Sequence, residues 1–220
     1  MSDKKNLEEI VKNKKDYTVV IIVGILVLSV VLLLIYVLDR NIKVESSKIF
    51  DVALDKINEF DTLPNLFSKQ EMEKEVISLL DNVIAKYPNT PSGKRALFYK
   101  GYILFNVNNF EKAENNFKYF IDKNKKNFLI PKAYYFLSYC YSEMNDNDKA
   151  IKLLEEFVNE FKDSYYMPLI LFRLANMYEA KKEKEKAITY YNKIIEDHPE
   201  SSQKNSAREK KILLENNIEL

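Results

Sequence analysis

The pattern of apolar and polar positions divides the chain into two unlike parts. Residues 19–38 contain no charged side chain, and only three residues interrupt a run of aliphatic ones. Because an α-helix rises about 1.5 Å per residue, this run would cross the roughly 30 Å hydrocarbon core of a bilayer. Further along, large apolar residues follow an alanine at helical spacing, as in Ala113, Phe117 and Phe120. The pattern predicts one transmembrane helix ahead of a helical domain.

Two other interpretations of residues 19–38 fit less well. A cleavable signal peptide has an apolar region of about 7–15 residues followed by small residues at a cleavage site. Here the run is longer and ends in Tyr36-Val-Leu-Asp-Arg-Asn41, which offers no such site. A buried core helix keeps a polar stripe, and this run has none. We therefore expect residues 19–38 to remain as an uncleaved transmembrane helix.

The flanks of this span predict its orientation. Five lysines precede it, and four basic residues occupy a comparable stretch after it. Cytoplasmic flanks carry the excess of Lys and Arg, and a short tail before a single span is the usual layout of a signal anchor. We expect residues 1–18 to be a short cytoplasmic tail in a protein of the cytoplasmic (inner) membrane. The domain beyond the span is then periplasmic or, more generally, extracytoplasmic.

The rest of the chain repeats itself with a period of 37 residues. Three segments superpose: Ala96-Leu-Phe-Tyr-Lys-Gly101, Ala133-Tyr-Tyr-Phe-Leu-Ser138 and Ile170-Leu-Phe-Arg-Leu-Ala175. Twelve residues after the end of each segment stands an alanine, at positions 113, 150 and 187. Self-similarity at a fixed period of this size indicates an array of stacked structural units.

These positions resemble the tetratricopeptide repeat. In that family, small residues stand where the two helices of a repeat cross closely. The resemblance implies an all-α solenoid of antiparallel helix pairs, with three full repeats at 91–200 and a degenerate first repeat unit at 42–90. A capping helix at 201–220 would shield the last repeat with residues 212–214 facing inward. The small residues at the close crossings are Gly101, Ala113, Ser138, Ala150, Ala175 and Ala187.

The turn inside each repeat differs at one position. The family usually has Gly at the first residue of this turn, and Asn108 and Asn145 occupy it in the first two repeats. Asparagine also tolerates the left-handed backbone conformation. Lys182 stands there in the third repeat, so we expect that turn to differ a little. Asn124 falls in a longer connection between repeats, where we expect a substitution to cost little.

Composition removes most catalytic chemistry. The 220 residues include one Cys and one His and carry a net charge of +1. One Cys and one His cannot build the usual zinc sites, and a balanced charge is not that of a nucleic-acid-binding protein. We expect His198 to complement a helix dipole and Cys140 to be a small buried hydrophobe. Since no P-loop, GxGxxG, GxSxG or CxxC motif occurs, we expect no catalytic residue, no metal and no cofactor.

The concave face is where we expect binding, because the first helices of tetratricopeptide repeats line it. Half of its predicted side chains are aromatic, which suits an extended or helical apolar segment, with Arg95 and Lys132 at one rim. Family members that bind a C-terminal carboxylate use Lys and Asn where Phe98, Tyr102 and Tyr135 stand here. Alternatively, a neighbouring helix or the protein's own N-terminal unit fills the groove. The predicted groove residues are Arg95, Phe98, Tyr102, Phe105, Lys132, Tyr135, Tyr139, Ser142, Leu169, Phe172, Asn176 and Glu179.

One span followed by about four such units resembles the membrane-anchored tetratricopeptide proteins of bacterial cell envelopes. The resemblance implies a scaffold or adaptor for envelope or secreted polypeptides, including chaperone-like binding near the Sec translocon. Alternatively, the protein is a fixed structural subunit of a larger machine, such as an outer-membrane assembly complex, a division complex or the collar of a spirochaete periplasmic flagellar motor. The expected partners are other proteins and, through residues 19–38, the lipid bilayer, with no nucleic acid and no small-molecule substrate.

Overall fold

The computed structural model describes the backbone of residues 2–218 and the side chains of residues 18–218. The side chains of the predicted cytoplasmic tail up to residue 17, and the last two residues of the predicted cap, lie outside the described residues. No strand occurs in the part that is described. The helices are α1 (Ser2–Thr62), α2 (Leu66–Lys86), α3 (Pro91–Asn106), α4 (Phe110–Lys123), α5 (Ile130–Glu143), α6 (Asn147–Glu160), α7 (Met167–Ala180), α8 (Lys184–Asp197) and α9 (Lys204–Glu215).

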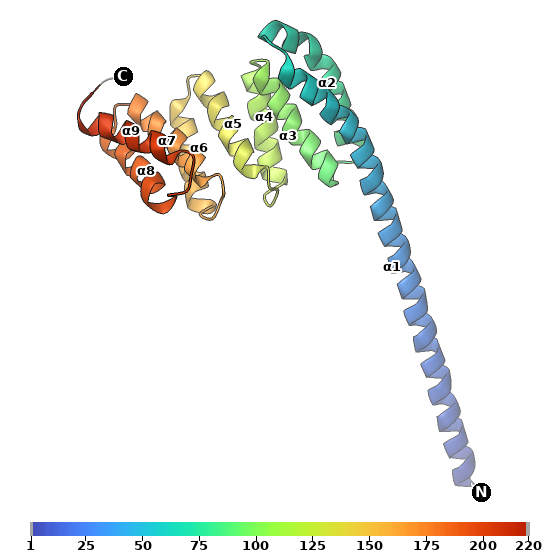
Figure 1. Cartoon of the computed structure of the whole chain (residues 1–220). Coiled ribbons are helices and arrows are strands. Elements are labelled where there is room, and N and C mark those ends of the chain that lie inside the picture. The colour runs from blue at the N-terminus through green and yellow to red at the C-terminus, as the bar shows by residue number, and fades with distance from the viewer. Residues whose placement is uncertain (1, 219–220) are drawn as a thin grey trace.

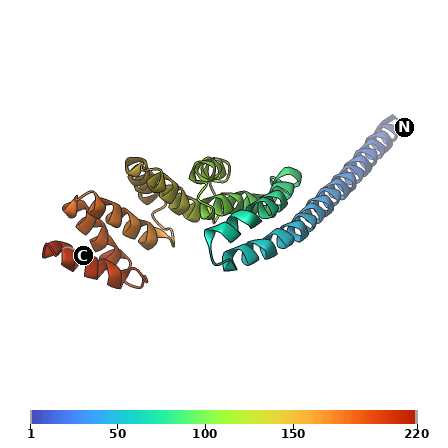
Figure 2. The same cartoon turned by 90° about the horizontal axis from the view of Figure 1, so that it is seen from above.

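The helices stack in chain order into one row of antiparallel pairs (Figures 1 and 2). The hairpins α3–α4, α5–α6 and α7–α8 are the three repeats, and α9 packs on the last of them. Connections therefore alternate between the two long edges of the row. One of these edges faces the direction in which α1 leaves (Figure 1). This arrangement confirms the predicted all-α solenoid.

One unbroken helix, α1, connects the predicted span to the first repeat unit. Every side chain of residues 19–38 is exposed, and none is covered by another part of the protein. From Ser46 onward one face of α1 becomes buried as it packs against α2. The small core of this first unit consists of Phe50, Ala53, Ile57 and Phe60 of α1 with Val76, Leu80 and Val83 of α2.

Local sequence sets where the first helix of each repeat begins. Each has a proline in its first turn, at positions 91, 131 and 168, where the missing N–H is not needed for an intrahelical bond. Thr90 also caps α3, because its hydroxyl accepts a hydrogen bond from the Gly93 N–H at 3.0 Å. At the start of α6 the Asp146 carboxylate accepts from the Lys149 N–H in the same way.

The first helices also end alike. Asn108, Asn145 and Lys182 have φ values of 63°, 61° and 61°, so all three lie in the left-handed region. In each repeat two backbone N–H groups close the helix end, as with Lys182 to the Glu179 carbonyl and Glu183 to the Tyr178 carbonyl, both at 2.9 Å. The expectation of a different third turn was therefore wrong. Two hydrogen bonds and the following helix hold Lys182 in a conformation that its side chain does not favour.

The six small residues at the predicted helix crossings are all buried. At Gly101 the approach is closest, because a Cβ atom there would lie 2.8 Å from Cε1 of Phe117 in α4. Large apolar side chains fill the space around these crossings, including Phe117, Leu154 and Tyr191. Each hairpin thus buries two large side chains of its second helix completely, the others being Phe120, Phe157 and Ile194.

Two predicted details are wrong. Asn124 is buried, and its side-chain amide donates to the Phe120 carbonyl at 3.1 Å, so it closes the end of α4. Ile212 in α9 is 49% exposed. The helix packs instead through Ala207, which is fully buried, with Leu214 partly buried against the same core. The buried face of α9 therefore runs through Ala207 and Leu214 and leaves Ile212 outside.

Candidate functional site

The N-terminal part of the predicted groove is covered by α1. The guanidinium of Arg95 lies over the ring of Phe50, 4.6 Å from its centroid. The hydroxyl of Tyr102 donates to Asp61 Oδ1 at 2.9 Å. Because Phe50 and Asp61 both belong to α1, Arg95 is not at the rim of an open groove. Here the alternative holds in which the protein's own N-terminal unit fills the groove.

Phe98 is not a groove residue. It is 3% exposed and packs against Phe117 and Phe120 of α4. Residues three apart share a helix face, so Phe98 lies on the side where Gly101 meets α4. Phe136 of the next repeat contacts the Phe98 ring as well. The rings of Tyr102 and Phe105 also pack against Phe136, and together these aromatics close the space between α3 and α5.

The groove is open between α5 and α7. A cleft of about 290 Å³ lies there, and it continues into a second cleft of about 620 Å³ that shares Leu169, Ser202 and Gln203 as walls. Five predicted groove residues line the smaller cleft: Tyr135, Tyr139, Leu169, Phe172 and Asn176. Sequence reasoning missed the remaining walls, which are Arg173 on α7 and Ser202, Gln203 and Ser206 around the start of α9.

Arg173 organises this cleft. Its Nε donates to Ser138 Oγ at 2.6 Å, and its Nη2 donates to the Ser138 carbonyl and to Ser142 Oγ, both at 3.0 Å. Burial lowers the pKa of Arg173, but a guanidinium stays protonated in proteins. Burial, with the hydrogen bond between the Tyr135 and Tyr139 hydroxyls, also raises the pKa of Tyr135 to about 12. Near neutral pH the cleft therefore offers a fixed cation, the neutral phenol of Tyr135 and apolar surface.

The position of Arg173 carries a signal in the repeat. It stands 37 residues after Phe136, the residue that closes the space between α3 and α5. Arg173 takes the equivalent place at the next junction, where it contacts Tyr139 and Ser138 of α5 and lines the cleft. The change from Phe to Arg at equivalent positions was the available clue.

The other predicted groove residues have different roles. Glu179 accepts from the Tyr191 hydroxyl at 2.8 Å and pairs with Lys210 of α9 at 3.0 Å, so it anchors α9. Ser142 supports Arg173, and Phe105 also packs against Phe110 at the start of α4 in its own repeat. Lys132 is exposed at the start of α5 and lines neither cleft.

The two side chains most often used in catalysis, those of Cys140 and His198, lie in different parts of the protein. Cys140 is fully buried, and burial raises the pKa of its thiol to about 12, which makes it a poor nucleophile near neutral pH. His198 lines the larger cleft together with Asp197 and Glu200. Within the described part of the chain, no group of three or more His, Cys, Asp or Glu residues could hold a metal ion.

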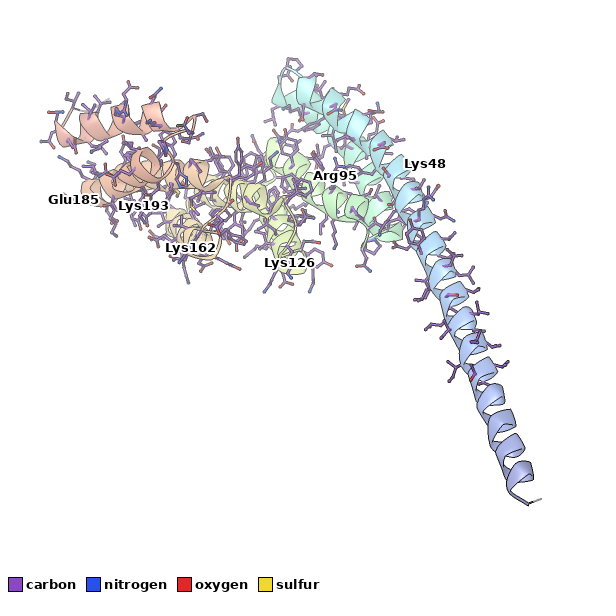
Figure 3. All side chains as sticks on the ribbon, turned by 60° about the horizontal axis from the view of Figure 1, so that its bottom comes forward. Lys48, Arg95, Lys126, Lys162, Glu185 and Lys193 are labelled. Carbon is purple, nitrogen blue, oxygen red and sulfur yellow. The ribbon has the colours of Figure 1, made fainter. Side chains whose placement is uncertain are left out.

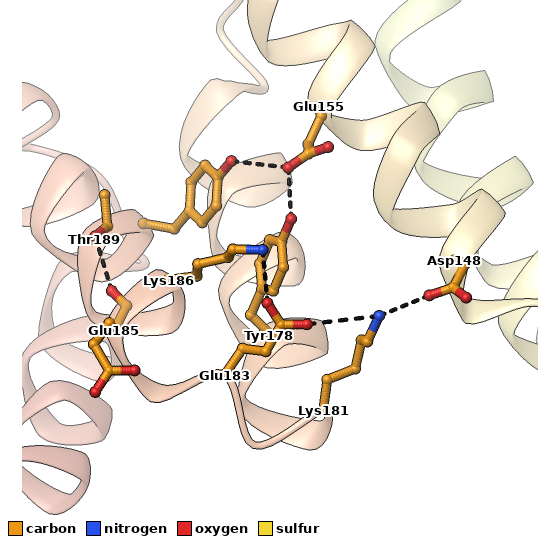
Figure 4. A network of polar contacts seen from close by, with 9 residues as sticks. Asp148, Glu155, Tyr178, Lys181, Glu183, Glu185, Lys186 and Thr189 are labelled. Atoms are coloured by element: carbon orange, nitrogen blue, oxygen red, sulfur yellow. Dashed lines mark hydrogen bonds and ion pairs between the residues drawn. The ribbon is translucent and has the colours of Figure 1, made fainter.

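A polar network fixes the second and third repeats to each other (Figure 4). The Tyr178 hydroxyl donates to Glu155 Oε1 at 2.6 Å, and the Tyr190 hydroxyl reaches the same oxygen at 3.4 Å. Lys181 pairs with Asp148 of α6 at 2.7 Å. These contacts join α6 to α7 and α8, so they hold the second repeat against the third.

Known protein families match this chain at two of its repeats. Family profiles of the tetratricopeptide repeat match residues 131–160 and 170–201. The chain contains tetratricopeptide repeats. Its two matched segments correspond to the second and third hairpins, which enclose the open cleft. Such repeats typically serve as non-enzymatic modules that bind other proteins, and this chain has the architecture of an interaction scaffold. No curated protein is significantly similar to it in sequence.

Solved structures share its fold at low sequence identity. MamA from Desulfovibrio magneticus RS-1 is 16% identical over 71% of this chain and 78% of its own, with a TM-score of 0.54. A tetratricopeptide-repeat protein from Parabacteroides merdae is 14% identical over 78% of this chain and 60% of its own, with a TM-score of 0.59. A putative kinesin light chain from Podospora anserina is 13% identical, covering 77% and 85%, with a TM-score of 0.55. These likenesses concern the fold.

Proposed function

We propose that this protein is a single-span scaffold of the cell envelope that binds a polypeptide segment in the cleft between α5 and α7. The observation that carries the proposal is that this cleft stays open while the equivalent space between α3 and α5 is closed. Its aromatic and apolar walls would receive side chains of an extended segment, and Arg173, Asn176 and Gln203 would bind its polar backbone. The protein catalyses no reaction in this proposal.

The membrane anchor in this proposal is residues 19–38. Their apolar side chains are exposed along the full length of the run, and an apolar surface of that extent is not stable in water. A bilayer satisfies it, because the helix bonds its own backbone groups and is long enough to span the hydrocarbon core. We place the N-terminus in the cytoplasm and the solenoid outside it, from the flanking charges.

Site-specific photo-crosslinking in cells tests the binding cleft. A photoreactive amino acid at Leu169, which lines both clefts, should give adducts with another polypeptide. The same amino acid at Ile212, an exposed apolar position on α9, should give few or none. Leu169→Glu should abolish capture of the same polypeptide by the full chain in detergent, whereas Ile212→Glu should leave capture intact. Equal adducts at both positions, or unchanged capture by folded Leu169→Glu, would contradict the proposal.

A second function is favoured by the continuity of α1. Since one helix passes from the span into the first repeat without a break, the solenoid is held at a set height and angle above the bilayer. That rigidity suits a fixed structural subunit of a larger envelope machine. It predicts that a few partners co-purify in constant ratio with the chain, and that Leu169→Glu does not change their recovery.

A further inference from the structure

A basic cleft lies beside α1 where this helix leaves the solenoid. It has a volume of about 870 Å³, and its walls come from α1, the start of α3 and the connection between α4 and α5. A single carboxylate lines it, that of Asp122, which pairs with neighbouring Lys123 at 2.9 Å. The cationic side chains around the cleft are Lys43, Lys94, Arg95, Lys123, Lys125 and Lys126.

Most of this charge is not neutralised inside the protein. Lys43 pairs with Asp39 and Lys123 with Asp122, but among the residues that the structure describes Lys94, Arg95, Lys125 and Lys126 form no ion pair. Phe128 also lines the cleft, and its side chain is 71% exposed. Clustered like charges favour an anionic ligand. An exposed aromatic ring beside them adds apolar surface that water does not favour.

With residues 19–38 in the membrane, as proposed above, this cleft would lie next to the bilayer. Lys43 stands five residues beyond Leu38, the last residue of the apolar run, or about 8 Å along the α1 axis. That distance is about one Debye length at physiological ionic strength. The connection between α4 and α5 lies on the long edge of the solenoid that faces the span (Figure 1). Figure 3 shows Lys126 and Lys162 along this same edge.

The charge along this edge changes with distance from α1. The connection nearest the basic cleft contains Lys125 and Lys126, whereas the connection between α8 and α9 follows Glu196 and Asp197 and contains Glu200. The connection between α6 and α7 contains Lys162 and Asp163, which cancel in charge, so the positive charge of this edge falls with distance from the span. A general affinity for anions would not require this placement.

We propose that the basic cleft binds anionic lipid headgroups of the membrane that holds α1, with Phe128 entering the interfacial layer. The proposal rests on the membrane position of residues 19–38. Lysines near an anionic membrane surface are attracted to it within a Debye length, and aromatic rings settle at the headgroup level. Contact at this cleft would add a second attachment and fix the orientation of the solenoid above the bilayer.

A single tryptophan tests this contact, because the chain has none of its own. The full-length Phe128→Trp variant is reconstituted into vesicles of phosphatidylcholine alone or mixed with phosphatidylglycerol. With phosphatidylglycerol, its emission should shift to shorter wavelength and be quenched by brominated lipid, and added salt should reverse both effects. Phe67→Trp is the matched control. Phe67 is 69% exposed at the start of α2, which lies on the edge of the solenoid away from the span. Its emission should be the same in both kinds of vesicle.

Charge variants identify the cleft as the cause. Lys125→Gln with Lys126→Gln in the Phe128→Trp chain should remove most of the shift, whereas Lys112→Gln with Lys152→Gln, an equal charge change on exposed positions of α4 and α6, should preserve it. Circular dichroism confirms that each variant is folded. Salt-resistant flotation with the vesicles tests the anchor separately. If the chain floats but Phe128→Trp shows no shift, or an equal shift in neutral vesicles, the lipid proposal is overturned while the anchor stands.

Discussion

The guanidinium of Arg173 lies over the ring of Tyr139, with its Cζ atom 3.2 Å from the ring centroid. The two residues belong to successive repeats, so this contact joins α7 to α5 across the open cleft. Arg173 also donates hydrogen bonds to Ser138 and Ser142 of α5. One side chain therefore shapes the cleft and connects two repeats, in the place that Phe136 fills one repeat earlier.

Replacing Arg173 should destabilise the solenoid. Arg173→Met keeps most of the apolar stem but removes three hydrogen bonds and the cation above Tyr139, and we expect a loss of about 1–3 kcal/mol. Arg173→Lys should lose less, although lysine cannot reproduce the forked geometry. Urea denaturation followed by circular dichroism measures both. Arg208→Met, at an exposed position of α9, is the control. An equally large loss of unfolding free energy there would show that the Arg173 contacts do not stabilise the solenoid.

Alkaline pH should weaken the joint between the second and third repeats. Burial and the charge of Glu155 raise the pKa of Tyr190 to about 12 and raise that of Tyr178 as well. A raised folded-state pKa gives stability that is complete below the ordinary tyrosine pKa of 10.0. That stability is lost as pH rises from there through the folded-state value. Glu155→Gln should flatten this fall in unfolding free energy above pH 10, and Glu185→Gln, at an exposed position, should leave it unchanged. Parallel curves for wild type and Glu155→Gln would contradict the assignment.

The left-handed turn at Lys182 offers a stabilising substitution. Most residues with a side chain lose roughly 1–2 kcal/mol in this conformation relative to the right-handed one, whereas Gly and Asn adopt it more readily. Because Asn108 and Asn145 already occupy the equivalent turns, Lys182→Asn should raise the unfolding free energy by about 0.5–1 kcal/mol. The reverse change, Asn145→Lys, should lower it by a similar amount. Thermal melts of the two variants compare them directly, and shifts of the same sign would rule out the explanation.

Sequence periodicity was enough to predict the hairpins, because the small residues at helix crossings are local to each repeat. Gly101 and Ala150 illustrate this, since both lie at buried crossings. The groove was predicted only in part. Whether Phe105 is covered depends on Phe136 in the next repeat, and whether Tyr102 is free depends on Asp61 in α1. Such contacts join separate repeats, and a pattern within one repeat does not contain them.

Ala150 should not accept a larger side chain. It is fully buried in α6, the second helix of its repeat, and close-packed interiors have no room for extra methyl groups. Ala150→Leu should cost about 1–3 kcal/mol through overpacking. Lys152→Leu, two residues along the same helix at an exposed position, should change stability by far less. Differential scanning calorimetry of the two variants distinguishes them, and similar melting temperatures would be evidence against the close crossing.

Gly101 tests the same principle against an opposing effect. In an exposed helix interior, Gly→Ala stabilises by about 1 kcal/mol because alanine is the better helix former. Here the new Cβ would lie 2.8 Å from Cε1 of Phe117 and 3.1 Å from Nδ2 of Asn116. The Phe117 ring is fully buried between Phe98 and Phe136, so it has little space in which to move.

Overpacking of about 1–3 kcal/mol should therefore equal or exceed the helix-propensity gain, and Gly101→Ala should lower the unfolding free energy by up to about 2 kcal/mol. Adding Phe117→Leu to Gly101→Ala makes room for the methyl group. In a double-mutant cycle the two changes together should cost less than the sum of the single changes. If Gly101→Ala alone raises the melting temperature, the helices do not cross as closely at Gly101 as the contact with Phe117 requires.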